Sequence, residues 1–442
     1  MDIRKTAKNA GILLAYPIAF AYQKYVLLDF SDEYVTLKKI IFVLFFILLN
    51  ELVVRGRGKK PAKETYFWYG IMAIVAVTYE TGLADWVSFI GLHLCAMYVA
   101  IVSNRLWYEG RTGSFIIADL FNSGIIKAFG GFPNLFKDLG SMRVKDKTSE
   151  TSEQKKASGP RGSVVGGILI VIVMIPIFCI AVALLSEINP FFGKMVEDLL
   201  DNINFKIVPL DVINFILNNM GYVIFAVPTS LYLYGMLSKS ADSDGEKEKR
   251  SCEGLIRWRQ KCRRISPFVS SVIAGLFVAL YLVFFVYEGQ YLFSAFAGRL
   301  PEEFTAAEYA RRGFFELTGI MFINMLIFLL ISYFENRELM GRKASVAITC
   351  ALMGESIVFA MVSFSKLALY YSRFGYTPKR LLAMWGTLIF AAGAVMVIIS
   401  LLRKKDCSRA WIWFTASSFA VMSVISSLIY IGLVYLGLGV TT

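Results

Sequence analysis

Runs of about 20 mostly apolar residues recur along almost the whole chain, and no other feature restricts its fold as strongly. A helix needs about 20 such residues to cross the hydrocarbon core of a bilayer. Eleven runs have this character, near 10–28, 38–54, 66–84, 87–105, 164–186, 213–236, 268–288, 314–334, 345–369, 381–402 and 410–438. Because lipid cannot satisfy backbone N–H and C=O groups, these runs predict an all-α, polytopic transmembrane helix bundle with about 11 spanning helices.

The composition supports a membrane protein over a large soluble one. The 442 residues are 57% hydrophobic and 18% charged, whereas soluble proteins are roughly 45–50% apolar and 25% charged. The net charge of +13 is of the kind that membrane proteins collect on their cytoplasmic side. We therefore expect a lipid bilayer as the main partner and no nucleic acid.

The distribution of Lys and Arg predicts a cytoplasmic N-terminus. Basic residues mark the cytoplasmic segments 1–8, 55–63, 106–163 and 237–267, and acidic residues mark the external segments 29–33, 80–86 and 187–212. The loop 371–380 is the exception, because it is basic but is expected outside. The N-terminal run resembles either a signal peptide or a signal anchor.

A polar, linker-like stretch between two groups of apolar runs predicts that the chain has three regions. Residues 1–113 would form a four-helix membrane region and 164–442 a seven-helix membrane region. Between them, 114–163 combines an amphipathic segment with a Ser-, Thr-, Lys- and Glu-rich linker. The amphipathic part is either a helix on the inner membrane surface or a packed connector.

Few residues could support catalysis or hold a cofactor. His93 is the one histidine, the six cysteines are scattered, and no phosphate-binding glycine motif is present. We expect no catalytic residue, no cofactor and no metal site. An enzyme stays an alternative through Asp29, Asp32 and Glu33, whose place in an early external turn resembles that of the catalytic acid of enzymes using lipid-linked sugars.

Ionisable and amide side chains inside the apolar runs are the main candidate functional residues, since each ionised group costs about 2.5–3.5 kcal/mol at a helix centre. Glu355 lies midway along its run, and Lys366 follows eleven residues later, close to three turns, so both point to one face. They form either a polar seam lining a cavity or a structural pair, with Lys366 snorkelling to the outer interface.

Three further residues join this set. Glu316 and Asn324 lie two turns apart in the 314–334 run, with Arg311 and Arg312 beside Glu316. Glu316 is either functional or part of a local surface pair. The intramembrane His93 is either a proton relay or an interhelical hydrogen-bonding group.

Three segments resemble a known family. They are "SEINPFFGKMVEDLL" (186–200), "EYARRGFFELTGIMFIN" (308–324) and "SFSKLALYYSRFGYTPKRLLAMW" (363–385). They resemble bacterial multi-pass membrane proteins of a domain of unknown function, DUF family 4173 with its sister 4153. The likeness covers about 160–440, with departures at Asn189, Phe374 and Tyr376. It implies a bacterial plasma membrane location and no known activity.

The best-matching segment also carries the unexpected external charge. Arg373, Lys379 and Arg380 would gather there and bind an anion, such as a lipid phosphate or a cell-wall polymer. Alternatively, they pair with external acids at Glu302, Glu303 and Glu308.

The leading functional expectation is a transporter or permease-like module. The alternatives are a non-catalytic envelope or signalling component, whose basic loops bind a cytoplasmic partner or anionic lipid, and a lipid-linked transferase.

Overall fold

The computed structural model describes residues 3–27, 35–144, 194–195, 219–298, 305–336 and 339–436. Within these ranges every regular element is a helix, which confirms the all-α expectation. The chain divides into two compact units. One comprises Met1–Pro61 with Phe121–Asp242, and the other Ala62–Leu120 with Ser243–Thr442.

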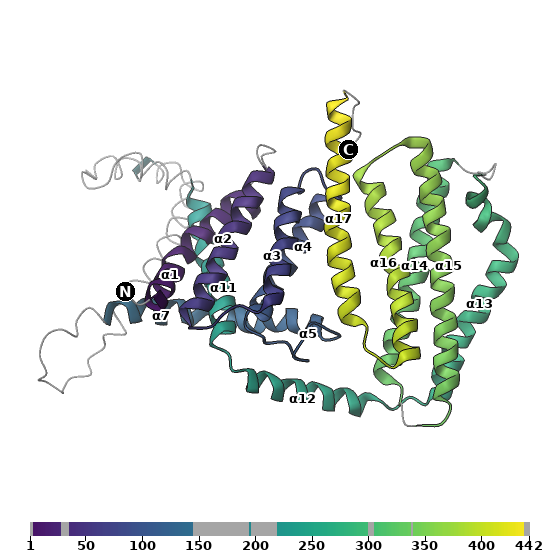
Figure 1. Ribbon diagram of the computed structural model, residues 1–442, viewed down its shortest axis with the longest axis horizontal. Helices are drawn as coiled ribbons and strands as arrows, with labels where there is room; N and C mark the ends of the chain where they lie inside the picture. Colours follow the sequence, from purple (N-terminus) through teal and green to yellow (C-terminus); the bar gives the residue numbers. More distant parts are fainter. Residues whose placement is uncertain are drawn as a thin grey trace, which may run out of the picture. The chain divides into compact units, whose positions relative to one another are not determined.

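The first unit is a small antiparallel bundle. Its elements are α1 (Ile3–Tyr22), the π-helix η1 (Gln23–Leu27), α2 (Val35–Gly56), the π-helix η2 (Asn122–Lys127), α6 (Ala128–Gly130), α7 (Phe132–Val144) and α11 (Met220–Asp242). Both α2 and α11 pack against α1, and α6 and α7 pack against α11 (Figure 1).

Two glycines allow α6 and α11 to approach at backbone distance. A Cβ atom on Gly235 would lie 2.7 Å from the carbonyl oxygen of Ala128, and one on Gly131 would lie 2.1 Å from that of Gly235. Neither contact is possible for a residue with a side chain, so these glycines position the short helices beside α11.

The segment 121–130 is amphipathic, with its large apolar side chains exposed and its polar side chains buried. Phe121, Ile126 and Phe129 are exposed, whereas Asn122 and Lys127 are buried. A segment bordered by water would turn its apolar side chains inward, so this arrangement suits a helix whose outer face contacts lipid. The segment is helical as expected, and its position on the inner membrane surface stays a prediction.

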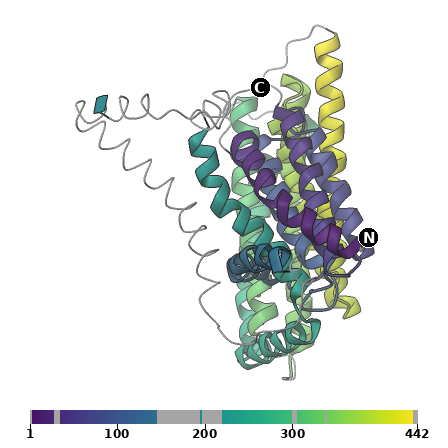
Figure 2. The same cartoon turned by 90° about the vertical axis from the view of Figure 1, so that its left-hand side faces the viewer.

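The second unit contains the longest helices. They are α3 (Lys63–Val77), α4 (Asp85–Ser103), α5 (Ile116–Phe121, whose last residue is assigned to the first unit), α12 (Gly245–Cys262), α13 (Pro267–Phe293), the 3-10 helix η4 (Ser294–Ala297), α14 (Ala306–Phe334), α15 (Arg342–Phe374), α16 (Pro378–Arg403) and α17 (Ser408–Tyr435). Helix α15 is central, since α13, α14 and α16 all pack on it. The polar helix α12 runs roughly at right angles to these helices, at the bottom of the views in Figure 1 and Figure 2, and contacts α14.

Burial follows this arrangement. Phe359 of α15 is fully buried against Phe285 and Tyr281 of α13. By contrast, Leu276 and Val286 of α13 are 67% and 81% exposed. Exposed apolar side chains on a helix of this length are typical of contact with lipid.

Seven described helices are long and apolar enough to cross a membrane. They are Asp85–Ser103, Met220–Asp242, Pro267–Gln290, Ala307–Phe334, Arg342–Phe374, Pro378–Arg403 and Ser408–Tyr435. This confirms the multi-pass membrane character. The expected run 164–186 lies outside the described residues, and 10–28, 38–54 and 66–84 form α1, α2 and α3, which are not among the seven. The count of about 11 spans and the side of the N-terminus stay predictions.

Candidate functional site

Glu355 occupies the middle of α15, the most enclosed helix of the second unit. Its side chain is 8% exposed, and neither carboxylate oxygen has a hydrogen-bond partner within the described ranges. The carboxylate interacts electrostatically with Tyr281 of α13. A buried, unsatisfied carboxyl group is costly to keep, so its presence here needs an explanation beyond packing.

A chain of hydrogen bonds connects three helices next to Glu355. The Tyr281 hydroxyl donates to Oδ1 of Asn324 over 3.0 Å, and Nδ2 of Asn324 donates to Oγ of Ser356 over 2.8 Å. Ser356 donates in turn to the carbonyl oxygen of Leu352. The sequence candidate Asn324 is therefore fully buried in a polar chain that ties α13, α14 and α15 together.

Lys366 lies elsewhere on α15. The eleven-residue separation places it about 16 Å along the axis from Glu355, too far for an ion pair. Its side chain is 1% exposed, and its Nζ atom lies 4.2 Å from the ring centroid of Tyr309. A Cβ on Gly313 would come within 2.5 Å of Cδ of Lys366, so α14 accommodates the lysine stem only because it carries glycine there.

Glu316 and His93 make local contacts. Oε1 of Glu316 lies 2.8 Å from Nε of Arg312, and both side chains are more than half exposed. Nδ1 of His93 lies 2.6 Å from the carbonyl oxygen of Phe89, one turn earlier in α4. Neither residue is brought to the Tyr281–Asn324–Ser356 chain by these contacts.

The basic candidates of 373–380 divide into two kinds. Nη1 of Arg380 donates to the carbonyl oxygens of Phe374 and Gly375, and Nη2 donates to the Tyr370 hydroxyl. These bonds satisfy backbone acceptors at the end of α15. Arg373 and Lys379 are exposed.

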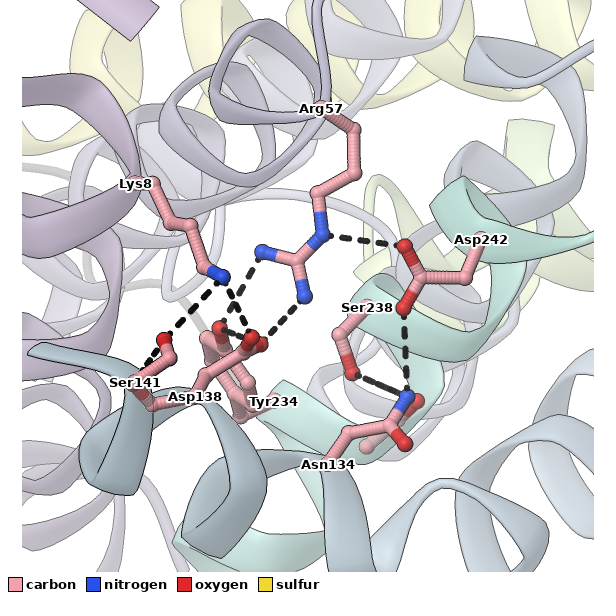
Figure 3. Close-up of polar contacts among 9 residues, drawn as sticks. Lys8, Arg57, Asn134, Asp138, Ser141, Tyr234, Ser238 and Asp242 are labelled. Atoms are coloured by element: carbon pink, nitrogen blue, oxygen red, sulfur yellow. Dashed lines mark hydrogen bonds and ion pairs between the residues drawn. The ribbon is translucent and has the colours of Figure 1, made fainter. Parts of the chain in front are cut away.

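A polar network in the first unit was missed by sequence reasoning (Figure 3). Asp138 of α7 accepts from Lys8, from Tyr234 of α11 and from Arg57. Nε of Arg57 also lies 3.1 Å from Oδ1 of Asp242. Further members are Asn134, Ser141 and Ser238. The one signal for it was the presence of Lys8 and Arg57 beside apolar runs, which was used only for topology.

The charges of this network are well compensated. Burial opposes the ionisation of Asp138, but bonds from Lys8 and Tyr234 and the charge of Arg57 together hold the pKa of Asp138 below its ordinary value. The arrangement fastens α7 to α1 and α11, and it is best explained as a structural clamp.

Asp119 of α5 is a second buried acid that sequence reasoning missed. It is 1% exposed, and it accepts a hydrogen bond from the backbone N–H of Tyr108 over 3.0 Å. Burial, together with the charges of Glu109 and Glu248, raises the pKa of Asp119 to about 7.

Within the described ranges, no group of three or more His, Cys, Asp or Glu side chains is placed to hold a metal ion. The five cysteines described there are unbonded thiols.

The fold and these polar groups define a multi-pass helical membrane protein, and its family follows from comparison. A profile for the domain of unknown function DUF4153 matches residues 67–433. The chain therefore belongs to the DUF4153 family, one of the two families that its motifs resemble. No curated protein and no solved structure shows significant similarity to the chain.

Proposed function

We propose that the chain is a membrane transport module in which Glu355 carries a proton or a cation. The observation that supports the proposal is the buried carboxyl group without a hydrogen-bond partner among the described residues. Ionisable groups inside membrane bundles are rare and usually belong to ion or proton pathways. The Tyr281–Asn324–Ser356 chain supplies hydroxyl and amide groups beside it.

The finer expectations belong to the same proposal. They are a bacterial plasma membrane location, a cytoplasmic N-terminus and about 11 spans. The main alternative is a non-catalytic envelope or signalling component, in which Glu355 would be sealed from water and exchange nothing. The residues that motivated a lipid-linked transferase, Asp29, Asp32 and Glu33, lie outside the described residues.

The test is the reactivity of Glu355 in the full chain, reconstituted in vesicles. A hydrophobic carbodiimide attacks protonated carboxyl groups within membranes, and mass spectrometry locates the adduct. We expect modification at Glu355 that decreases as the pH rises, and none in Glu355→Gln. Glu316→Gln is the matched control, because it removes an exposed, ion-paired glutamate from the neighbouring helix.

Water access completes the test. In a chain without native cysteines, Glu355→Cys is expected to react with a membrane-impermeant thiol reagent. Normal folding without any reaction at position 355, by either reagent, would reject a transport role for Glu355 and favour the non-catalytic component.

A further inference from the structure

Three arginines converge in the second unit where α12 ends and α15 begins. Arg259 lies in the last turn of α12 and Arg263 is its C-cap. Arg342 follows Gly341, whose Cβ position would lie 3.8 Å from Cβ of Pro267. Burial lowers the pKa of Arg263, and the positive charges of Arg259 and Arg342 lower it further. Like charges are brought together at a cost. A cluster of this kind suggests that a bound anion compensates it.

The arginines are poorly satisfied by the protein. Arg259 stacks over the Tyr333 ring at 4.5 Å and its Nη2 atom lies 3.4 Å from Oγ of Ser332. The Nε atoms of Arg259 and Arg263 are buried and have no hydrogen-bond partner in the part of the chain that the structure describes. Among the described residues, no carboxylate pairs with Arg259, Arg263 or Arg342.

Two helix N-termini lie at the same place. Helix α13 begins at Pro267 and α15 at Arg342, after the N-cap residue Gly341. A Cβ on Gly341 would lie 3.8 Å from Cβ of Pro267, so the two N-termini are adjacent. No side chain caps α15. At α13, Oγ of Ser266 already accepts from the N–H of Val269, and Pro267 has no N–H. The uncapped end of α15 is therefore the one whose N–H groups, with the helix dipole, favour an anion.

One described carboxylate lies at this end of α15. Helix α14 ends here, and the carboxylate of Glu335 accepts a hydrogen bond from Oγ of Ser345 over 2.5 Å. The backbone of Ile265 bonds to Phe334 and Asn336, which fixes the link between α12 and α13 against the end of α14. The arginines are thus held on an ordered frame, and Glu335, bonded to the first turn of α15, forms no ion pair with any of the three.

The location indicates which anions can reach the cluster. It lies at the ends of three candidate membrane spans, α13, α14 and α15. Trp258 on α12 and Phe268 on α13 are 62% and 74% exposed beside it. Aromatic side chains with an apolar body are favoured at the membrane–water interface. The cluster is therefore expected at headgroup depth.

We propose that Arg259, Arg263 and Arg342, with the adjacent uncapped N-terminus of α15, bind a phosphate group. Guanidinium groups match phosphate oxygens with paired, charge-assisted hydrogen bonds. The phosphate comes from an anionic lipid headgroup or from free inorganic phosphate, two sources with the same chemistry. This site is independent of Glu355 and of any transport role.

The experiment uses the full chain, purified in detergent with bound lipid removed, and follows its melting temperature. One arm titrates phosphatidylglycerol against phosphatidylcholine, and the other titrates inorganic phosphate against chloride at equal ionic strength. A ligand that binds only the folded state raises the melting temperature. We expect the wild type to respond to phosphatidylglycerol, to inorganic phosphate, or to both.

Arg263→Gln and Arg342→Gln are expected to need at least about tenfold more ligand for the same response, because each loses charged hydrogen bonds. Without ligand, both are expected to be as stable as the wild type or more so, since each relieves repulsion. Arg257→Gln is the matched control: it removes the same charge from α12, about 200° around the helix from Arg259.

The outcomes are distinct. Response to phosphatidylglycerol alone identifies a lipid site, and response to inorganic phosphate identifies a site for the free anion as well. If Arg257→Gln weakens the response to ligand as much as Arg263→Gln and Arg342→Gln do, the response reflects unspecific charge attraction and the proposal is overturned. A wild type that responds to neither ligand would also overturn it.

Discussion

Nζ of Lys8 lies 2.7 Å from Oδ1 of Asp138, so an ion pair joins α1 to α7 across a long stretch of sequence. The other oxygen of Asp138 accepts from Tyr234 and from Arg57. One carboxylate therefore connects three parts of the first unit, and its removal takes the ion-pair partner from Lys8 and leaves Arg57 with Asp242 alone.

Asp138→Asn is expected to destabilise the protein by about 3 kcal/mol, the usual loss when one partner of a buried ion pair is removed. Thermal unfolding of the purified chain in detergent measures this loss. The control is Glu253→Gln, an exposed acid on α12. If Asp138→Asn and Glu253→Gln have the same melting temperature, the network does not stabilise the fold.

The pKa of Asp119, raised to about 7 by burial, predicts the sign of a pH effect. The folded state holds this proton more tightly than the unfolded state, where the ordinary value is 3.8. The stabilising contribution of Asp119 is therefore largest below pH 3.8 and is lost as the pH rises through about 7. Asp119→Asn keeps an acceptor for the Tyr108 N–H and removes the charge.

Melting temperatures of wild type and Asp119→Asn between pH 5 and pH 8 test this expectation. The melting temperature of Asp119→Asn is expected to rise relative to that of the wild type as the pH increases. A constant difference across the range would contradict the assignment.

Gly235→Ala is expected to destabilise the first unit by about 1–3 kcal/mol, because the new Cβ would lie 2.7 Å from the Ala128 carbonyl oxygen and force the helices apart. Gly221→Ala is the control in the same helix, since nothing lies within 4 Å of its Cβ position. Alanine is the better helix former, so this control is expected to be neutral or stabilising. The prediction is contradicted if the melting temperature of Gly235→Ala is not below that of Gly221→Ala.

Tyr281→Phe is expected to cost about 0.6 kcal/mol, the average measured for interhelical hydrogen bonds in membranes. The variant leaves Oδ1 of Asn324 without its donor. Tyr287→Phe removes a hydroxyl from the same helix at an 82% exposed position and is expected to have no effect. A double-mutant cycle with Asn324→Ala isolates the coupling, which should be near zero for Tyr287.

Several features could be predicted from the sequence because they depend on local composition. The apolar runs identified each of the seven candidate spans now described, from Asp85–Ser103 to Ser408–Tyr435. The burial of Glu355, Lys366 and Asn324 also agrees with their place inside those runs. In each case a side chain's environment depends on its depth in the membrane, and depth follows from position along one helix.

Which groups meet was decided by the tertiary structure alone. The spacing of Glu355 and Lys366 placed them on one face of α15. Because they are far apart along the helix axis, however, Lys366 contacts Tyr309 and Glu355 lies near Tyr281. Asp138 lies outside every apolar run, and its partners come from α1, the end of α2 and α11. The convergence of Arg259, Arg263 and Arg342 depends on where α12 ends and where α13 and α15 begin. Periodicity along one helix cannot encode such meetings, because they depend on which helices pack together and at what height.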